Sequence, residues 1–427
     1  MRVARRSARD SRAPAADAAR EIGDVLGRLV TRSGTIPPQE VPALVARELE
    51  GVGCADVEVR MRTLDQRDLV LLDGRVDEHP AETVPVDGSL VGRAYSTSRS
   101  VDQLLDDARV RVHQPALDGS ERVGVLSTTV DADVLDADVR DALAQVAALV
   151  ATLVVTKSAY TDAYLTTRRT RPMTLPAQLQ WQLLPPLTLR TELVEIAGAL
   201  EPAHDIAGDS FDYALNDGVL HLCVLDAMGH GLDAATMATL VVAAYRHERQ
   251  RDADLPALYA SADRAMEEQF GPETFATAQM ARLDVRSGLL RWVNAGHPPP
   301  LLLRDRTVVR ALERPTTLPV GLGGDTPEVH AEQLEPGDAV LFHTDGVTDE
   351  RMPDGTFFGE SRLYDLLEQV SVSEQRVEEM VRRLSLRLLD ARGGVTTDDV
   401  TLLLVRWSGR AVGTTTSTTG SGGAGAR

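Results

Sequence analysis

Aspartate residues stand at the ends of apolar, strand-like segments in the second half of this 427-residue chain. Asp226 ends the apolar run from 219 to 225, and Gly229 and Gly231 then favour a turn before helically spaced small residues. The other aspartates at such termini are Asp209, Asp345, Asp398 and Asp399. One aspartate at a turn says little, because this residue is common in turns and caps. If several of these strand ends converge, however, their charges repel one another unless a cation lies among them.

Strand candidates outnumber helix candidates between 183 and 407. The apolar strand candidates are 219–225, 274–285, 289–295, 300–304, 339–344 and 400–407. The stretch from Arg286 to Gly288 predicts a hairpin between two of them. Helices are predicted at 234–247, 255–270, 360–369 and 373–391. Hairpin-linked strands with helices between them predict an α+β fold, in which an antiparallel β-sandwich is flanked by helices.

The first part of the chain predicts a separate, smaller domain. A length of 427 residues exceeds one ordinary core. Residues 21–135 combine helix candidates with short strand candidates, which indicates a small α/β domain. Residues 1–20 and 408–427 are rich in small and polar residues and are predicted to be loose tails.

A helix is predicted to run from Asp136 to about Arg169, and we assign residues 136–182 to a linker between the domains. Its apolar residues alternate spacings of four and three, as in a heptad seam, and they are Val139, Leu143, Val146, Val150 and Leu153, continued by Tyr160 and Tyr164. Two interpretations remain open at this point. The helix is either an ordinary packed helix or a linker that joins two chains in a homodimer.

Composition excludes several classes of function. A formal net charge of −19 argues against nucleic acid as the main partner. Lys157, the only lysine, lies near no glycine loop, which excludes Walker-type nucleotide sites and protein kinases. The longest apolar run, 143–155, is too short to span a membrane. Cys54 and Cys223 lie in apolar runs and are expected to be reduced core thiols, so we expect a cytoplasmic protein.

The candidate ligands indicate which cation the aspartates would hold. No histidine or cysteine pair has the spacing of a zinc site, and every candidate is a carboxylate. Hard oxygen ligands favour Mg²⁺ or Mn²⁺. Two such ions sharing an aspartate lower the pKa of a bound water and neutralise charge on a phosphoryl group, which suits hydrolysis of a phosphate ester.

Six sequence blocks then resemble a known family in their order. They read AGDSFDY, LDAMGHGLDAA, WVNAGHPPPLLLR, LEPGDAVLFHTDGVTD, FFGESRL and TTDDVTLLLVRW. They resemble the metal-dependent serine/threonine phosphatases of the protein phosphatase 2C superfamily, in the bacterial SpoIIE and RsbU-like branch. The resemblance covers about 178–407, and LPAQLQWQLLPPL at 175–187 resembles the short helical entry to this domain.

The resemblance implies a set of site residues. Asp209 and Asp226 would bind a pair of Mn²⁺ or Mg²⁺ ions and serve catalysis, with Asp226 bridging and the Ala227 carbonyl as a further ligand. Asp345 and Asp398 would complete the shell of one ion. The family more often has glycine at 207 and 227, but a carbonyl ligand needs no particular side chain.

The sequence also predicts where other polar residues near these blocks lie. Asp212 and Asp399 are expected to be caps or neighbours of the ligands, with a third ion as an alternative. We expect His230 to lie in a surface turn, His297 to support the hairpin exit, and His343 to pack beside Asp345.

The segment 84–103, VPVDGSLVGRAYSTSRSVDQ, resembles the late strand and helix of GAF sensor domains. This resemblance implies that residues 21–135 form a GAF-like sensor. Any other small α/β domain remains the alternative.

The resemblances together imply a phosphatase under sensor control. Its substrate would be a phosphoserine or phosphothreonine on a regulatory protein, with an anti-anti-sigma protein of the STAS type as the expected partner. A phosphatase fold that has lost catalysis and serves as a binding scaffold is the alternative, but none of the metal aspartates is missing. A two-metal nucleotidyl cyclase is disfavoured because no lysine is available for purine selection. We further expect the linker to place residues 178–187 against the catalytic sheets.

Overall fold

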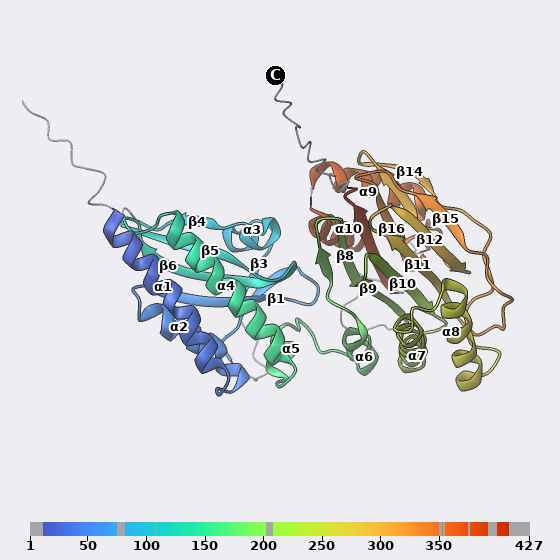
Figure 1. The fold of residues 1–427 in the computed structure, drawn as a ribbon, viewed down its shortest axis with the longest axis horizontal. Coiled ribbons are helices and arrows are strands. Elements are labelled where there is room, and N and C mark those ends of the chain that lie inside the picture. The colour runs from blue at the N-terminus through green and yellow to red at the C-terminus, as the bar shows by residue number, and fades with distance from the viewer. Residues whose placement is uncertain are drawn as a thin grey trace, which may run out of the picture.

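The computed structural model describes residues 12–74, 82–106, 108–201, 208–349, 352, 355–374, 376–391 and 399–409. The described residues form two domains side by side, with the N-terminal domain in blue to green and the C-terminal domain in green to red (Figure 1). Helix α1 (Arg12–Ser33) begins well inside the segment predicted to be a loose tail, and Ala15 in it is buried. The prediction of a loose tail up to residue 20 is therefore wrong for the residues from Arg12 onward.

The N-terminal domain is built on one antiparallel sheet with the order β3-β2-β1-β6-β5-β4. Its strands are β1 (Ala55–Arg62), β2 (Asp68–Leu71), β3 (Thr83–Pro85), β4 (Val101–Leu104), β5 (Arg109–Asp118) and β6 (Glu121–Asp131). Alternate side chains face opposite sides of a strand. In β6, Leu126 accordingly joins the main core with α1, α2 (Val41–Glu50) and α4 (Ala137–Ser158). Its neighbour Val125 joins a small second core under α3 (Leu90–Thr97).

The predicted linker helix is shorter than expected and belongs to the N-terminal domain. Helix α4 ends at Ser158, a separate short helix α5 (Ala163–Thr167) follows, and Tyr160 between them is 78% exposed. The prediction of one helix from 136 to 169 is therefore wrong. The seam residues Val139, Leu143, Val146 and Val150 are fully buried, and α4 packs on α1 and β5. The chain itself fills the seam, which favours the packed-helix interpretation.

Helix α4 also has the length and composition of a membrane span, and it is the one helix of the described residues that does. About 44% of its most apolar window is buried inside the chain. Core helices of globular domains share this composition, and α4 carries core residues of the N-terminal domain.

The C-terminal domain is a sandwich of two antiparallel sheets. The first, here called the β9 sheet, has the order β15-β12-β11-β10-β9, and the second, the β17 sheet, has the order β14-β13-β16-β17-β8-β7. The strands are β7 (Thr188–Arg190), β8 (Val194–Glu201), β9 (Asp209–Asn216), β10 (Val219–Ala227), β11 (Ala276–Asp284), β12 (Leu289–Ala295), β13 (Leu301–Arg304), β14 (Thr307–Ala311), β15 (His330–Gln333), β16 (Ala339–His343) and β17 (Val400–Trp407). Phe211, Trp292, Phe342 and Leu403 meet in the core between the sheets.

Helices cover both outer faces of this sandwich. Helices α7 (Leu232–Arg249) and α8 (Leu255–Phe270) pack on the β9 sheet, and α9 (Gly359–Ser373) and α10 (Val377–Ala391) pack on the β17 sheet (Figure 1). Helix α6 (Leu175–Leu183) enters the domain beside α7. The predicted α+β class and the antiparallel sandwich flanked by helices are both confirmed.

Candidate metal centre

Two neighbouring strands of the β9 sheet bring Asp209 and Asp226 together. Asp209 is the first residue of β9, and Asp226 is the last but one of β10. The antiparallel register pairs these two residues directly. Directly paired side chains on antiparallel strands lie within about 5.5 Å at their Cβ atoms, so the two carboxylates share one end of the sheet.

The β17 sheet delivers further carboxylates to the same end. Asp345 follows β16 and opens the short helix η2 (Asp345–Val347), while Asp399 directly precedes β17. Strands β16 and β17 are antiparallel neighbours, so the end of one lies beside the start of the other. The backbone N–H of Asp209 donates to Oδ2 of Asp399 at 3.3 Å, which joins the two sheets at this point. Asp398, a predicted ligand, lies outside the described residues.

The buried carboxylates make this end of the sandwich unfavourable for negative charge. Asp209 is 2% exposed, and burial raises its pKa well above the ordinary value, with the charges of Asp226 and Asp399 adding to the effect. Hydrogen bonds from Thr344 and Thr401 oppose this rise, and the Thr344 hydroxyl lies 2.6 Å from Oδ2 of Asp209. Burial and the charge of Asp349 also raise the pKa of Asp345, against a hydrogen bond with the Asp226 side chain.

The donor set fits divalent cations that prefer oxygen. The side chains gathered here that could bind a metal are carboxylates, which supply oxygen ligands. A cation among them would offset the repulsion between their negative charges. Gly208 adds an argument from shape, since a Cβ at this position would stand 3.1 Å from the carbonyl oxygen of Ala227. Glycine therefore leaves room beside that predicted ligand. Within the described residues, no three acidic, histidine or cysteine side chains are close enough to form a complete metal cage.

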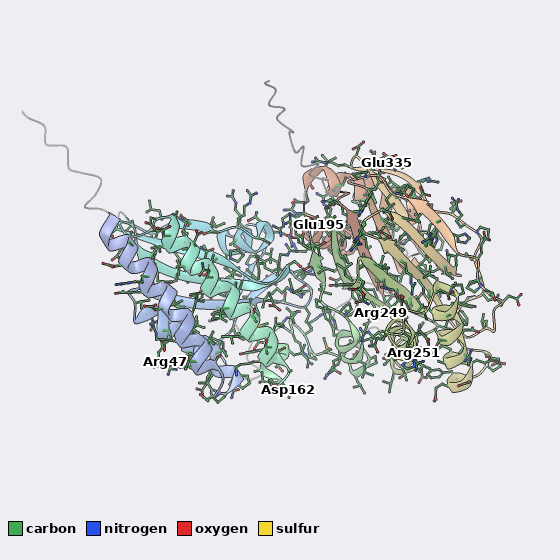
Figure 2. The ribbon with its side chains drawn as sticks, in the orientation of Figure 1. Arg47, Asp162, Glu195, Arg249, Arg251 and Glu335 are labelled. Atoms are coloured by element: carbon green, nitrogen blue, oxygen red, sulfur yellow. The ribbon has the colours of Figure 1, made fainter. Side chains whose placement is uncertain are left out.

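Asp212 does not contribute to this centre. Its carboxylate is buried and forms ion pairs with Arg246 at 2.7 Å and with Arg249, both on α7. Arg249 is labelled beside that helix in Figure 2. Two guanidinium groups already neutralise this carboxylate, which disfavours the alternative that Asp212 holds a third ion. Asp399, the other candidate for a third ion, instead accepts hydrogen bonds from the Asp209 backbone and from Gln180.

The histidines near the carboxylates take supporting positions. The His297 backbone N–H and carbonyl bond the Asn294 side chain at 2.8 Å and 2.9 Å, which closes the turn after β12. Burial, and then the neighbouring His343, lower the pKa of His297 to about 3, so this ring is neutral. Burial also lowers the pKa of His343, whose Nδ1 lies 3.1 Å from the Thr344 carbonyl oxygen. His230 lies exposed in the turn before α7.

Sequence reasoning did not single out Gln180. This side chain of α6 is 3% exposed, and its Nε2 donates to the carbonyl oxygen of Asp209 at 2.6 Å and to Oδ2 of Asp399 at 3.3 Å. Arg246 holds the end of the same helix through the carbonyl oxygen of Leu183 at 2.6 Å. Glutamines occupy 178, 180 and 182, and only the rotation of α6 against the sandwich selects the one that points inward.

The C-terminal half of the chain is similar to known proteins. Residues 216–408 match the family model of stage II sporulation protein E (SpoIIE). The chain is 24% identical over 262 residues to protein IcfG of Synechocystis sp., covering 55% of this chain and 39% of that protein. It is 23% identical over 233 residues to the phosphoserine phosphatase RsbU of Bacillus subtilis, covering 54% of this chain and 69% of that protein.

Among solved structures, the SiaA PP2C domain of Pseudomonas aeruginosa is 24% identical, with 54% of this chain and 93% of that chain covered and a TM-score of 0.46. The RsbU and RsbW domains of a Mycobacterium tuberculosis protein are 28% identical, with 50% of this chain and 61% of that chain covered and a TM-score of 0.44. The chain thus spans 39% of the length of the first curated relative and 61% of the first solved chain.

Proposed function

The C-terminal domain is a SpoIIE-type domain of the PP2C phosphatase family, and from this premise we propose that the chain is a metal-dependent protein serine/threonine phosphatase. One observation carries the proposal: strand ends from both sheets gather Asp209, Asp226, Asp345 and Asp399 at one end of the sandwich. A fold that had lost catalysis would have no need to keep these carboxylates buried against one another. The alternative of a non-catalytic scaffold is therefore not favoured.

Two Mn²⁺ or Mg²⁺ ions would be held by Asp209, Asp226, Asp345, Asp398 and the carbonyl oxygen of Ala227, with Asp226 bridging. When bound, such ions supply an activated water and neutralise charge on the phosphoryl group. The chain's own contribution is to orient the ligands. The Thr344 hydroxyl donates to Oδ2 of Asp209, and the hydrogen bond between Asp226 and Asp345 holds the Asp226 carboxylate toward the β17 sheet.

The proposed substrate is a phosphoserine or phosphothreonine on a regulatory protein, with a STAS-type anti-anti-sigma protein as the partner. Support comes from the relatives, since RsbU and RsbP of Bacillus subtilis are both phosphoserine phosphatases. One solved relative joins an RsbU domain to an RsbW domain in a single protein, which fits a partner-switching pathway. A net charge of −19 accords with a protein partner and not with nucleic acid.

We propose that the N-terminal domain is a GAF-like sensor and that it controls the phosphatase. We further propose that the protein is cytoplasmic and has no membrane partner. Helix α6 joins the two domains, and Gln180 on it bonds both Asp209 and Asp399. A shift of α6 would therefore disturb the carboxylates directly. A homodimer remains part of the proposal, but its contact would lie outside the α4 seam, which is buried within one chain.

The test is release of phosphate from a phosphorylated STAS protein and from a small aryl phosphate, with Mn²⁺ added to the full chain. Asp226→Ala removes the bridging carboxylate and should lower turnover on both substrates by several orders of magnitude, a scale consistent with metal-assisted catalysis. The matched control is Asp233→Ala, an exposed carboxylate in the first turn of α7, which should keep native turnover. Near-native activity of Asp226→Ala would show that the metal centre is assigned to the wrong residues.

A further inference from the structure

Two buried arginines connect helix α3 of the N-terminal domain to helix α10 of the C-terminal domain. Arg122 lies on β6 and Arg382 on α10, and both bind Glu379 of α10. Arg382 also binds Asp87, two residues before the N-cap of α3. We call the residues Asp87, Arg122, Glu379 and Arg382 the α3–α10 clamp.

Arg122 holds the C-terminal end of α3. Its side chain is 2% exposed, with Nη1 2.9 Å from Oε2 of Glu379 and Nη2 3.1 Å from the Glu378 carbonyl oxygen. The same guanidinium lies 4.6 Å over the ring of Tyr95 and donates to the carbonyl oxygen of Ser96 at 3.3 Å. One side chain thus contacts α3 and α10 at once.

Arg382 holds the opposite end of α3. Its side chain is 1% exposed, and Nη2 lies 2.8 Å from Oδ1 of Asp87 and 2.7 Å from Oε1 of Glu379. Burial alone would raise the pKa of Glu379, but the hydrogen bond from Arg382 and the charge of Arg122 outweigh it and lower that pKa. The buried network is therefore ionised, and removing one partner leaves an uncompensated charge.

Helix α3 packs over a small core that is separate from the main core of its domain. It covers the face of the sheet opposite to α1, α2 and α4, over a small core of its own made by Leu69, Val86, Ala94, Tyr95 and Val125. Elements with few buried apolar contacts are the first to move in a folded domain. A change in the N-terminal domain that disturbs this small core would therefore displace α3.

Helix α10 reaches the carboxylate end of the sandwich. Ser385 follows Arg382 by three residues, on the adjacent turn of the same face, and its hydroxyl donates to Oε1 of Glu201 at 3.4 Å. Glu201 ends β8 and is paired in register with Val400 of β17, the residue that follows Asp399. The clamp and the contact at Glu201 therefore share one helix.

We propose that α3 is the element through which the N-terminal domain acts on the catalytic end, and that the clamp transmits its position to α10 and from there to the strand ends at Glu201 and Asp399. This route is separate from the one through α6. The inference deepens the proposed function, because it names a residue path for control by the N-terminal domain. Both ends of α3 must stay bound for α10 to keep the position seen here.

The experiment compares Asp87→Ala and Arg122→Ala with the native full chain by hydrogen exchange, in the absence of metal. Asp87 is 60% exposed, so its replacement keeps the buried part of the network and should fold normally. We expect amide exchange in the second half of α10 and at the start of β17 to accelerate about fivefold or more, the lower range of measured couplings between sites. The matched control is Arg387→Ala on the same helix, whose guanidinium reaches Gln369 of α9, and it should not change exchange at α3.

The second measurement is the Mn²⁺ concentration that gives half-maximal hydrolysis of an aryl phosphate, which should change in both clamp variants. Faster exchange confined to α3, with α10 and β17 unchanged, would overturn the proposal and leave the clamp as simple domain packing. Faster exchange in α10 with unchanged Mn²⁺ dependence would overturn the control function. Because exchange is measured without turnover, a failure of the phosphatase assignment itself would not affect the first result.

Discussion

Replacing Thr344 by valine isolates the hydrogen bond that orients Asp209. Thr344 is fully buried, donates its hydroxyl to Oδ2 of Asp209 at 2.6 Å, and accepts the backbone N–H of Thr401 at 3.0 Å. Valine has nearly the same shape, so Thr344→Val removes these two bonds without opening a cavity. The variant therefore tests orientation of a ligand and not packing.

The expected size of the effect follows from the kind of bond lost. A hydrogen bond to a charged group contributes about 1.5–3 kcal/mol. The same bond lowers the pKa of Asp209, so its loss raises that pKa further and favours the protonated carboxyl, which binds cations poorly. Each 1.4 kcal/mol corresponds to a factor of ten, and we expect Mn²⁺ affinity to fall by roughly 10- to 100-fold.

The assay is calorimetric titration of the metal-free protein with Mn²⁺, together with the free energy of unfolding in urea. Thr236→Val is the matched control, because this threonine is exposed on α7 and its hydroxyl bonds only the Leu232 carbonyl oxygen of its own helix among the bonds described. Thr236→Val should bind Mn²⁺ as the native chain does. If Thr344→Val lost stability but kept native Mn²⁺ affinity, Thr344 would support the fold alone and the reasoning about Asp209 would fail.

Two further predictions concern the domain cores. Val146→Glu combined with Val150→Glu places two unpaired charges in the core of the N-terminal domain, so calorimetry should show that this domain has lost its cooperative unfolding transition. The prediction would be contradicted if the domain stayed folded and light scattering showed only that the chain had become monomeric. Burial lowers the pKa of His113 and of His221 from 6.5 to about 4. Between these two pH values the histidines are protonated in the unfolded chain but not in the folded one, so the free energy of unfolding should fall as the pH drops from 6.5 to about 4. His113→Gln should flatten this fall in urea titrations at several pH values, and an unchanged slope would refute the assignment.

The sequence predicted the interior of the C-terminal domain well because its central strands are apolar on both faces. Strands β10, β11, β16 and β17 are almost entirely buried, and each stands out as an apolar run. An aspartate that follows such a run must sit where the strand leaves the core. The sequence therefore places the aspartates at strand ends, and the pairing of the strands, which it does not show, brings those ends together.

Strands at the sheet edges and strands with weak propensity escaped prediction. Strands β4, β7, β14 and β15 lie at or near sheet edges with one face open to solvent, so they carry no continuous apolar run. Strand β8 is central, but it contains alanines and Gly198, which disfavour strands. A Cβ at Gly198 would stand 2.3 Å from the Phe211 ring, so the glycine is required by packing between the sheets, which local sequence cannot reveal.

The seam of α4 illustrates what periodicity can and cannot establish. The spacing of Val139, Leu143, Val146 and Val150 correctly identifies a buried face, but it carries no information about what covers that face. The sequence therefore left two interpretations open, an ordinary packed helix and a linker that joins two chains. Helix α1 begins at Arg12 and has 22 residues, the same length as α4, and the two pack together. A contact between two chains would therefore have to use a surface other than the α4 seam, which α1 already covers.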